Sequence, residues 1–474
     1  MTPQPETHLQ GNGDGGRSVT AELLRRYDKP GPRYTSYPTA VEFRESFDEA
    51  AYRDHLARAA ASPEQPLSLY LHLPFCEERC TFCGCMVVIT RKRHVAAGYL
   101  GYLHREIAML AESLKGRRRV VQYHWGGGTP TYLDVGQIEA LQRVVADHFD
   151  VDPDGEVAIE VDPRVTSTGQ IERLAELGFN RLSMGVQDFT PEVQRAVNRI
   201  QSEEQTRALF ELARARGFGS INIDLIYGLP FQTLATFAGS VDAVIAMRPD
   251  RVAVYSFAHV PWIRGHQNRI QPEDLPPPEL KIELFVEAMH RFLDAGYRQI
   301  GMDHFALPDD ELARASEQRT LHRNFMGYTV RPAPDMLATG VSGIGDVCGA
   351  FAQNVKKLSS YYEALDAGRF PIERGYVLDD DDKLRRYVIT ELMCNFRVEK
   401  ERVRQRFDVD FDRYFEAELR ELEEGPVGHG FLEIAADRLE VTPRGRLFIR
   451  NVCMSFDRYL RSKTQDKPVF SRTI

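Results

Sequence analysis

Residues 66–85 read PLSLYLHLPFCEERCTFCGC, a short apolar run followed at once by four cysteines. The apolar run is typical of a β-strand. In the second half, Cys76, Cys80 and Cys83 form the pattern C-x3-C-x2-C. Thiolates are the usual ligands of iron–sulfur clusters, and a four-iron cluster held only by protein takes four of them. Three cysteines at this spacing therefore predict a [4Fe–4S] cluster with one iron left open, which is a catalytic arrangement.

Two other uses of cysteine fit this pattern less well. A disulfide is disfavoured because the distant cysteines Cys348, Cys394 and Cys453 stand singly and nothing indicates secretion. A structural zinc site needs a second Cys or His pair, and none follows at a suitable distance. Cys85 as a fourth ligand would close the cluster, and we interpret it as a non-ligand that lines the site. The spacing resembles the signature of radical S-adenosylmethionine (SAM) enzymes, in which SAM chelates the open iron.

Composition and charge limit the classes of function. A net charge of −9 argues against a general nucleic-acid binder, and an anionic substrate would need a local basic pocket. No apolar run approaches the roughly 20 residues that span a bilayer. The first 18 residues contain no apolar stretch that could act as a signal peptide. We therefore expect a cytoplasmic protein that binds neither membrane nor nucleic acid.

Strand-like and helical stretches alternate along most of the chain. The strand-like stretches are residues 66–74, 120–125, 157–162, 181–187, 220–230 and 251–259. Helical stretches between or after them are 96–114, 136–148, 202–216 and 233–247. Such alternation indicates parallel βα units. Six or more units without a nucleotide-binding glycine motif after the first strand predict a full or partial (β/α) TIM-like barrel rather than a Rossmann sheet. The cysteine loop would then lie at the C-terminal face, where barrels keep their active sites.

The 474 residues should hold more than one domain, and the pattern changes around residues 368–375. We expect a disordered tail at 1–18, an arm over the active site at 19–60, a catalytic barrel at 61–370 and a C-terminal domain at 371–474. A further strand is expected within 297–306. In the last domain, 379–396 predicts a helix with an acidic first turn, and 430–460 predicts a hairpin followed by a helix. This order is typical of a mainly helical, winged-helix-like domain, which we interpret as an intramolecular lid.

Polar residues gather where several of the predicted strands end. Three glycines in HWGGGTP, residues 124–130, would let a ligand lie directly against the backbone. Glu160, Gln187 and Asp224 end later strands, although each alone could be a helix cap or a loop residue. Glu and Asp supply the acceptors that ribose hydroxyls and an amino group need. Arg199 could pair with a carboxylate or be a solvent-exposed helix charge.

A set of segments resembles the oxygen-independent coproporphyrinogen III oxidase (dehydrogenase) family of radical SAM enzymes. They are PRYTSYPTA (32–40), YLHLPFCEERCTFCGC (70–85), HWGGGTPTYL (124–133), EVDPR (160–164), NRLSMGVQDF (180–189), NIDLIYGLP (222–230), GMDHFA (301–306), HRNFMGYT (322–329) and CNFR (394–397). The resemblance runs from about residue 30 to the end. It implies oxidative decarboxylation of two propionate side chains of coproporphyrinogen III to the vinyl groups of protoporphyrinogen IX, in heme biosynthesis.

The resemblance also implies the cofactors and partners. In the family an electron enters the cluster and cleaves SAM to methionine and a 5′-deoxyadenosyl radical, which takes a hydrogen from the β-carbon of a propionate. We expect a low-potential electron donor such as flavodoxin or ferredoxin, and a monomer.

The resemblance assigns roles to residues at matching positions. Cys76, Cys80 and Cys83 would bind the cluster. One SAM would be held by Tyr70, Gly127, Glu160 and Ile344, of which Tyr70 and Glu160 are counted as catalytic. A second SAM would be held by Phe82, Gly128, Thr129, Gln187, Arg199, Asp224 and Ala258.

The four carboxylates of the substrate should be surrounded by cations. Arg33 and Arg397 are the candidates, because Arg pairs with carboxylates through two hydrogen bonds. Arg33 could instead form a structural salt bridge that pins the arm. Tyr34 and Tyr37 could cover the pocket or pack the arm on the barrel. A lid is expected, because a primary radical must be kept from water.

The sequence leaves open two roles for some polar residues, and two alternative functions for the chain. Asp303 and His304 could line the pocket or form a satisfied buried pair, and His72 is expected to point into the scaffold. A related heme chaperone is the alternative function, disfavoured by PRYTSYP, Cys85 and the domain that carries CNFR. A radical SAM enzyme of another substrate class, such as a methyltransferase that uses two SAM molecules, is disfavoured by the full-length motif match.

Overall fold

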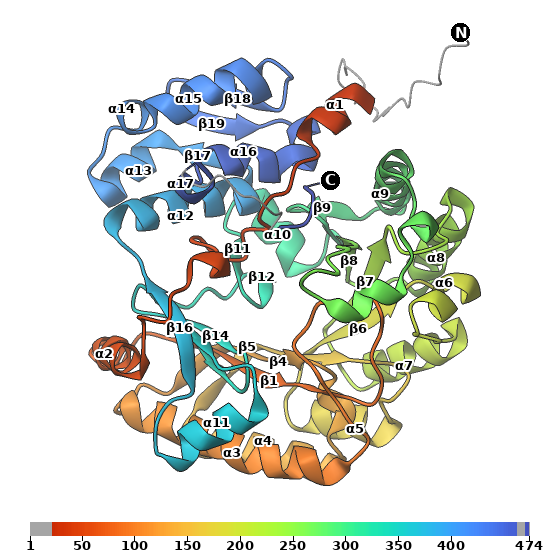
Figure 1. The fold of residues 1–474 in the computed structure, drawn as a ribbon, viewed down its shortest axis with the longest axis vertical. Helices are drawn as coiled ribbons and strands as arrows, with labels where there is room; N and C mark the ends of the chain where they lie inside the picture. The colour runs from red at the N-terminus through yellow and green to blue at the C-terminus, as the bar shows by residue number, and fades with distance from the viewer. Residues whose placement is uncertain (1–20, 462–469, 474) are drawn as a thin grey trace.

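The computed structural model describes residues 21–461 and 470–473 (Figure 1). The tail expected at 1–18 lies outside the described residues. One twelve-stranded sheet forms the body of the molecule, in the order β16-β15-β14-β13-β1-β4-β5-β6-β7-β8-β10-β9. Within the described ranges no pairing joins its edge strands β16 and β9, so the sheet is a partial barrel, as the sequence predicts.

The six predicted strands are confirmed, and they run parallel as neighbours. They are β1 (Leu67–Leu73), β4 (Arg119–Gly127), β5 (Asp150–Val161), β6 (Arg181–Gln187), β7 (Ser220–Tyr227) and β8 (Arg251–Ser256). Because parallel strands end at the same edge of a sheet, the polar residues at their C-terminal ends come together there.

Helices cover the outer side of this sheet in Figure 1. They are α3 (Arg93–Ser113), α4 (Val135–His148), α5 (Thr168–Glu176), α6 (Pro191–Ala196), α7 (Glu203–Ala215), α8 (Leu234–Met247) and α9 (Pro278–Asp294). Capping boxes at Asp134, Ser167 and Thr233 start three of them, because side-chain acceptors satisfy the free N–H groups of the first turn. Buried aliphatic and aromatic side chains fill the space between helices and sheet, including Leu69, Leu71, Trp125, Ile159 and Ile223.

Several strands were not predicted or were predicted differently. The single strand expected within 297–306 is a hairpin of β9 (Arg298–Ile300) and β10 (His304–Ala306), because Gly301 adopts a φ of +59° and turns the chain. On the other side of β1 lie β13 (Asp335–Thr339), β14 (Ile344–Val347), β15 (Ala350–Asn354) and β16 (Ile372–Val377). The sheet thus extends to Val377, beyond the domain boundary expected at 370.

The C-terminal domain contains helices and a small sheet of order β17-β19-β18. Its strands are β17 (Arg397–Glu399), β18 (Leu432–Ile434) and β19 (Arg438–Val441), and its helices are α12 (Asp380–Asn395), α13 (Lys400–Phe407), α14 (Phe411–Tyr414), α15 (Glu416–Leu422), α16 (Ile449–Ser455) and α17 (Arg458–Arg461). The predicted acidic helix, hairpin and following helix correspond to α12, β18–β19 and α16.

Short elements complete the described chain. They are α1 (Ala21–Tyr27), α2 (Glu49–Ala59), β2 (Phe75–Cys76), β3 (Val88–Ile89), α10 (Glu311–Gln318), β11 (His322–Asn324), β12 (Gly327–Thr329) and α11 (Leu358–Asp366). No helix in the described ranges is long and apolar enough to cross a membrane.

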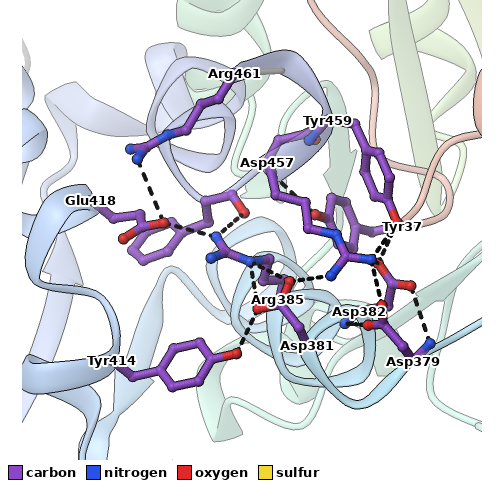
Figure 2. A network of polar contacts seen from close by, with 12 residues as sticks. Tyr37, Asp379, Asp381, Asp382, Arg385, Tyr414, Glu418, Asp457, Tyr459 and Arg461 are labelled. Atoms are coloured by element: carbon purple, nitrogen blue, oxygen red, sulfur yellow. Dashed lines mark hydrogen bonds and ion pairs between the residues drawn. The ribbon is translucent and has the colours of Figure 1, made fainter. Parts of the chain in front are cut away.

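Within the arm expected at 19–60, the segment between α1 and α2 runs between the barrel and the C-terminal domain (Figure 1). From here on, the arm means this segment. Pro30 forms a bridge with Arg472, and Arg44 forms one with Gly375. Tyr34 and Tyr37 are buried in the apolar core that they share with the C-terminal domain. Figure 2 shows the polar network that Tyr37 joins, beside the start of α12. The arm is therefore held mainly by the C-terminal domain rather than by the barrel alone.

Candidate active site

The cysteine loop leaves β1 at its C-terminal end and is fixed along its length. β2, which contains Cys76, pairs with β3. The Thr81 N–H donates to the Val197 carbonyl oxygen at 3.0 Å, and Asn198 Nδ2 donates to the Arg79 carbonyl oxygen at 3.0 Å. His266 Nε2 lies 2.8 Å from the Cys83 carbonyl oxygen. These contacts hold the loop in one conformation.

The three cysteines of the motif lie close enough for the charge of one to affect the others. Burial raises the pKa of the Cys76 thiol to about 11, and a contact of 3.4 Å with Thr129 Oγ1 opposes this only in part. A hydrogen bond from Cys85 lowers the pKa of Cys83 to about 6. Cys85 therefore lies directly beside one of the three motif cysteines.

Within the described residues, no three His, Cys, Asp or Glu side chains converge as they would around a single metal ion. A four-iron cluster makes a different demand, because each thiolate bonds a different iron and the sulfurs surround the cluster. Three mutually close thiols on one fixed loop fit that demand, and thiolates are the donors that iron–sulfur clusters take. The donor set therefore fits the cluster predicted from the spacing.

Tyr70, from the middle of β1, lies near Gly127 at the end of β4 and Glu160 near the end of β5. The Gly127 N–H donates to Glu160 Oε2 at 3.0 Å, and His124 Nε2 lies 3.4 Å from Glu160 Oε1. The Tyr70 ring stacks on His124 with ring centroids 5.9 Å apart. Burial raises the pKa of Glu160, but His124 and the Gly127 N–H outweigh it, so the pKa is lowered. The carboxylate is therefore held ionised as an acceptor.

Glycine at position 127 is required by its surroundings. Its φ is +116°, which side-chain-bearing residues rarely adopt, and an added Cβ would lie 2.5 Å from the His72 ring. His72 itself is buried, and its ring nitrogens lie 3.0 Å from the Tyr70 hydroxyl and 3.0 Å from the Met86 carbonyl oxygen. His72 thus belongs to the scaffold, as expected.

Gln187, Arg199 and Asp224 follow on the neighbouring strands and their loops. Arg199 is buried and its Nη1 lies 2.9 Å from Asp162 Oδ2, so it is a paired internal cation rather than a solvent-exposed one. Gln187 ends β6 with a φ of +72°. Burial raises the pKa of Asp224 to about 6, against hydrogen bonds from Asn222 and Ser183.

Of the remaining predicted SAM residues, Phe82, Gly128 and Ala258 lie at or near the cysteine loop, whereas Ile344 lies apart from it. Gln267 Nε2 donates to the carbonyl oxygens of Phe82, at 3.1 Å, and Ala258, at 3.2 Å, which brings these two residues together. The Gly128 N–H donates to the Leu73 carbonyl oxygen at 2.9 Å. Ile344 begins β14, on the other side of β1, where it packs against a small apolar cluster around Phe351.

Asp162 and Arg164 lie beside the cluster loop. Neither was singled out from the sequence, although both stand in the quoted segment EVDPR. Arg164 Nη2 donates to Asp162 Oδ2 at 2.7 Å and lies 3.7 Å from Cys80 Sγ. Arg199 Nη1 lies 3.7 Å from the same sulfur. Asp162 thus holds two guanidinium groups against one cysteine, a role that only the folded chain reveals.

The two arginines expected to bind substrate occupy different places. Arg33 Nη1 lies 3.2 Å from Asp303 Oδ2, and its Nη2 donates to the Ser256 carbonyl oxygen at the end of β8. Asp303 is buried and also pairs with His304 at 2.8 Å, which supports the interpretation of a satisfied buried pair, and its ion pair with Arg33 supports a structural salt bridge that pins the arm. Arg397 instead lies near Glu399 and Glu440 in the small C-terminal sheet, at 3.6 and 3.8 Å. The structure does not bring Arg397 together with the residues at the strand ends.

A cavity of about 230 Å³ reaches the cysteine loop from the surface. Its lining includes Cys76, Thr129, Asp162 and Arg164, and the exposed side chains of Glu78 and Ile200 stand at its edge.

Comparison with known proteins places this geometry in a class. Residues 70–244 match the model of the radical SAM superfamily, and residues 378–448 match that of the HemN C-terminal domain. The solved structure of coproporphyrinogen III oxidase (HemN) from Escherichia coli, described as a radical SAM enzyme, superimposes with a TM-score of 0.87 at 47% identity, covering 90% of this chain and 97% of that one. The partial barrel and its cysteine loop therefore define a radical SAM enzyme.

Curated relatives narrow the class to a family. The oxygen-independent coproporphyrinogen III oxidase of Escherichia coli (strain K12) is 47% identical over 453 residues, which cover 95% of this chain and 98% of that protein. The Pseudomonas aeruginosa protein of the same name is 46% identical over 459 residues, covering 96% and 98%. This chain belongs to the oxygen-independent coproporphyrinogen III oxidase family. It is an enzyme of heme biosynthesis that works by radical SAM chemistry with a [4Fe–4S] cluster and SAM. Membership of this family favours the oxidase over the two alternative functions, the heme chaperone and the methyltransferase.

Proposed function

We propose that this chain converts two propionate side chains of coproporphyrinogen III into the vinyl groups of protoporphyrinogen IX. Each propionate loses one hydrogen atom from its β-carbon, one CO2 and one further electron. The observation that carries the proposal is that the cysteine loop reaches the C-terminal end of β4: Cys76 Sγ lies 3.4 Å from Thr129 Oγ1, next to Gly127, which donates to Glu160 near the end of β5. When bound, the cluster and SAM supply the one-electron chemistry that removes a hydrogen atom from an unactivated carbon.

The chain's own residues bind and orient these groups. Cys76, Cys80 and Cys83 hold the cluster, while Asp162 keeps cationic groups against Cys80. Tyr70, Gly127, Glu160 and Ile344 hold one SAM. The ionised Glu160 serves as acceptor, since its pKa is held low. Phe82, Gly128, Thr129, Gln187, Arg199, Asp224 and Ala258 hold a second SAM.

On the substrate side, Arg33 pairs with a propionate carboxylate. Its present partners, Asp303 and the Ser256 carbonyl oxygen, leave further N–H donors of the guanidinium for an anion. The neighbours of Arg397 account for its charge within the C-terminal domain, so they give no support to a substrate role. The buried Tyr34 and Tyr37 support a lid in which the arm and the C-terminal domain act together to exclude water.

The chain works as a cytoplasmic monomer that takes electrons from a low-potential donor such as flavodoxin or ferredoxin. Support for external electron delivery comes from the cavity that leads from the exposed Ile200 to Cys76. Because this side of the loop opens to the surface, a donor protein can approach the cluster without entering the barrel.

The test is an anaerobic assay of the reconstituted enzyme with SAM, dithionite and coproporphyrinogen III. The wild type should form protoporphyrinogen IX and 5′-deoxyadenosine. Cys80→Ala should lose iron and both products, whereas Cys85→Ala should keep the iron of the wild type because Cys85 is not a ligand. SAM cleavage without a vinyl product in the wild type would contradict the substrate assignment, and loss of iron in Cys85→Ala would contradict the three-cysteine assignment.

A further inference from the structure

Several cationic side chains gather where the arm, the end of β8 and the C-terminal domain meet. The group comprises Arg33, Lys281 and Arg450, from the arm, α9 and α16 respectively. Burial is the main cause that lowers the pKa of Lys281 and of Arg450; the positive charges of Arg33 and Arg450 lower that of Lys281 further, and Arg33 also lowers that of Arg450. This group lies outside the cysteine loop and the strand-end residues described above.

Lys281 is held over the end of β7 and β8 without a carboxylate partner among the described residues. Its Nζ donates to the Phe257 carbonyl oxygen at 3.1 Å and lies 5.9 Å from the centre of the Tyr227 ring. The side chain packs over Gly228, where an added Cβ would lie 2.9 Å from Lys281 Cε. One of three N–H donors is therefore used, and two remain.

Arg450 is a second cation with no carboxylate partner in the described ranges. It is 4% exposed, and it donates to three backbone carbonyl oxygens, those of Pro32, Gly31 and Arg472. Burial lowers the pKa of Arg450 to about 9, and burial also lowers that of Lys281 to about 8. Burying an unpaired charge is costly, so the buried Arg450 and the half-buried Lys281, whose pKa the charge of Arg450 lowers, indicate that an anion belongs near them.

The carboxylates nearby do not balance this charge. Asp303 is already paired with Arg33 and His304, and Asp28 forms an ion pair with Arg472. Asp28 also acts on Lys281 through its charge, and Asp303 acts on Arg450, but neither cation forms an ion pair with a carboxylate among the described residues.

The position of the group relates it to the reaction. Arg33 Nη2 donates to the Ser256 carbonyl oxygen, and Lys281 Nζ donates to that of Phe257. These two carbonyls immediately precede Ala258, a residue of the strand-end site. The two cations thus flank the end of β8 on the side where the barrel meets the arm.

We propose that Lys281, together with Arg33, binds a propionate carboxylate of the substrate, and that the buried Arg450 supplies positive potential to the same subsite. The inference rests on the proposed function, because the ligand class is a carboxylate of a tetra-anionic porphyrinogen. Lys281 and Arg33 make direct contact, since both keep N–H donors free. Arg450 acts through its charge, because its donors hold the arm and the residues near the C-terminus.

The experiment compares steady-state kinetics of reconstituted wild type, Lys281→Met and Lys281→Arg with coproporphyrinogen III as the varied substrate. Losing a charge-assisted hydrogen bond should raise KM for the porphyrinogen by roughly tenfold to a hundredfold in Lys281→Met. Lys281→Arg should restore most of the wild-type KM. Affinity for SAM and the cluster absorption spectrum should not change in either variant.

Lys356→Met is the matched control, because this substitution also removes one lysine charge, but from a surface residue that pairs with Glu373. It should leave KM unchanged. If Lys281→Met does not fold, Lys281→Gln replaces it, since the amide can still donate to the Phe257 carbonyl oxygen. A KM within twofold of wild type, or a loss confined to SAM binding, would overturn the proposal. A wild type that makes no vinyl product would instead contradict the proposed function itself.

Discussion

At the scale of single residues, Asp224 has a charge state that depends on pH within an accessible range. Burial raises its pKa to about 6, so the side chain holds a proton below that pH and is ionised above it. Because only the ionised form is a full acceptor, SAM affinity should fall as the pH drops through about 6. Asp224→Asn should bind SAM about tenfold more weakly at neutral pH and show no such fall.

Equilibrium dialysis of SAM against the anaerobic holoenzyme between about pH 5 and 8 measures this dependence. Asp242→Asn is the control, because Asp242 pairs with Arg291 on the outer helices. Identical pH profiles for wild type and Asp224→Asn would show that another group is responsible.

Residues that carry chemistry differ in how far sequence predicts them. The cysteines were predictable because their ligand role depends only on local spacing. Arg199 could not be distinguished from a surface charge until Asp162, in another strand segment, was found beside it. Lys281 and Arg450 were missed for the same reason: Arg450 bonds to Pro32, 418 residues away in the chain.

At the scale of elements, α12, the first helix of the C-terminal domain, begins with a capping box. The Asp379 side chain accepts from the Asp382 N–H, and it also pairs with Arg458 at 2.7 Å. Asp379→Ala should lower the free energy of unfolding by about 1 kcal/mol through loss of the cap. Asp379→Asn should lose less, because Asn caps helices nearly as well. Urea unfolding followed by circular dichroism compares the two variants.

The pH dependence of this effect has a definite sign. Burial raises the pKa of Asp379, but the hydrogen bond to Arg458 and the Asp382 N–H outweigh it and hold the pKa below 3.8. A lowered pKa contributes stability above the unfolded value that is lost as the pH falls through the folded value. The difference between wild type and Asp379→Ala should therefore shrink below about pH 4. A difference that stays constant into acid would contradict the role of the charge.

Strands and helices were predictable from the sequence where they are long enough to show a regular alternation of apolar and polar residues. The six parallel strands alternate with helices of nine residues or more except at α6, and the periodicity changes at each boundary. The strands β13 and β15 are five residues long and buried throughout, so no alternation marks them. Glycines between and beside β13, β14 and β15 also made this region resemble a loop.

At the scale of the whole molecule, the arm and the C-terminal domain share one apolar core. The arm contributes Tyr34, whose hydroxyl donates to Asp457 at 3.0 Å, and Tyr37, whose hydroxyl accepts from the Arg458 N–H. Figure 2 shows Tyr37, Asp457 and the acidic first turn of α12 meeting in one network. Sequence predicted an arm and a domain, but their shared core depends on contacts between the two ends of the chain.

Arg458 joins the end of the C-terminal domain to the first turn of α12. Its guanidinium lies 2.7, 2.6 and 3.0 Å from carboxylates of Asp379, Asp381 and Asp382. Arg458→Met should leave these acidic groups without their shared cation and loosen the arm. Hydrogen exchange should then become faster in residues 30–40 while β1, deep in the barrel, keeps its protection.

The loosened arm should also change the chemistry in a measurable way. If the arm excludes water and wrong hydrogen donors from the radical, Arg458→Met should form more 5′-deoxyadenosine for each vinyl group than wild type. Arg404→Met is the control, because the exposed Arg404 pairs with Glu401 of the same helix, α13. Faster exchange with unchanged product ratio would mean that the barrel shields the radical alone. A raised ratio without faster exchange would mean that Arg458 acts on the site through its charge and not through the arm.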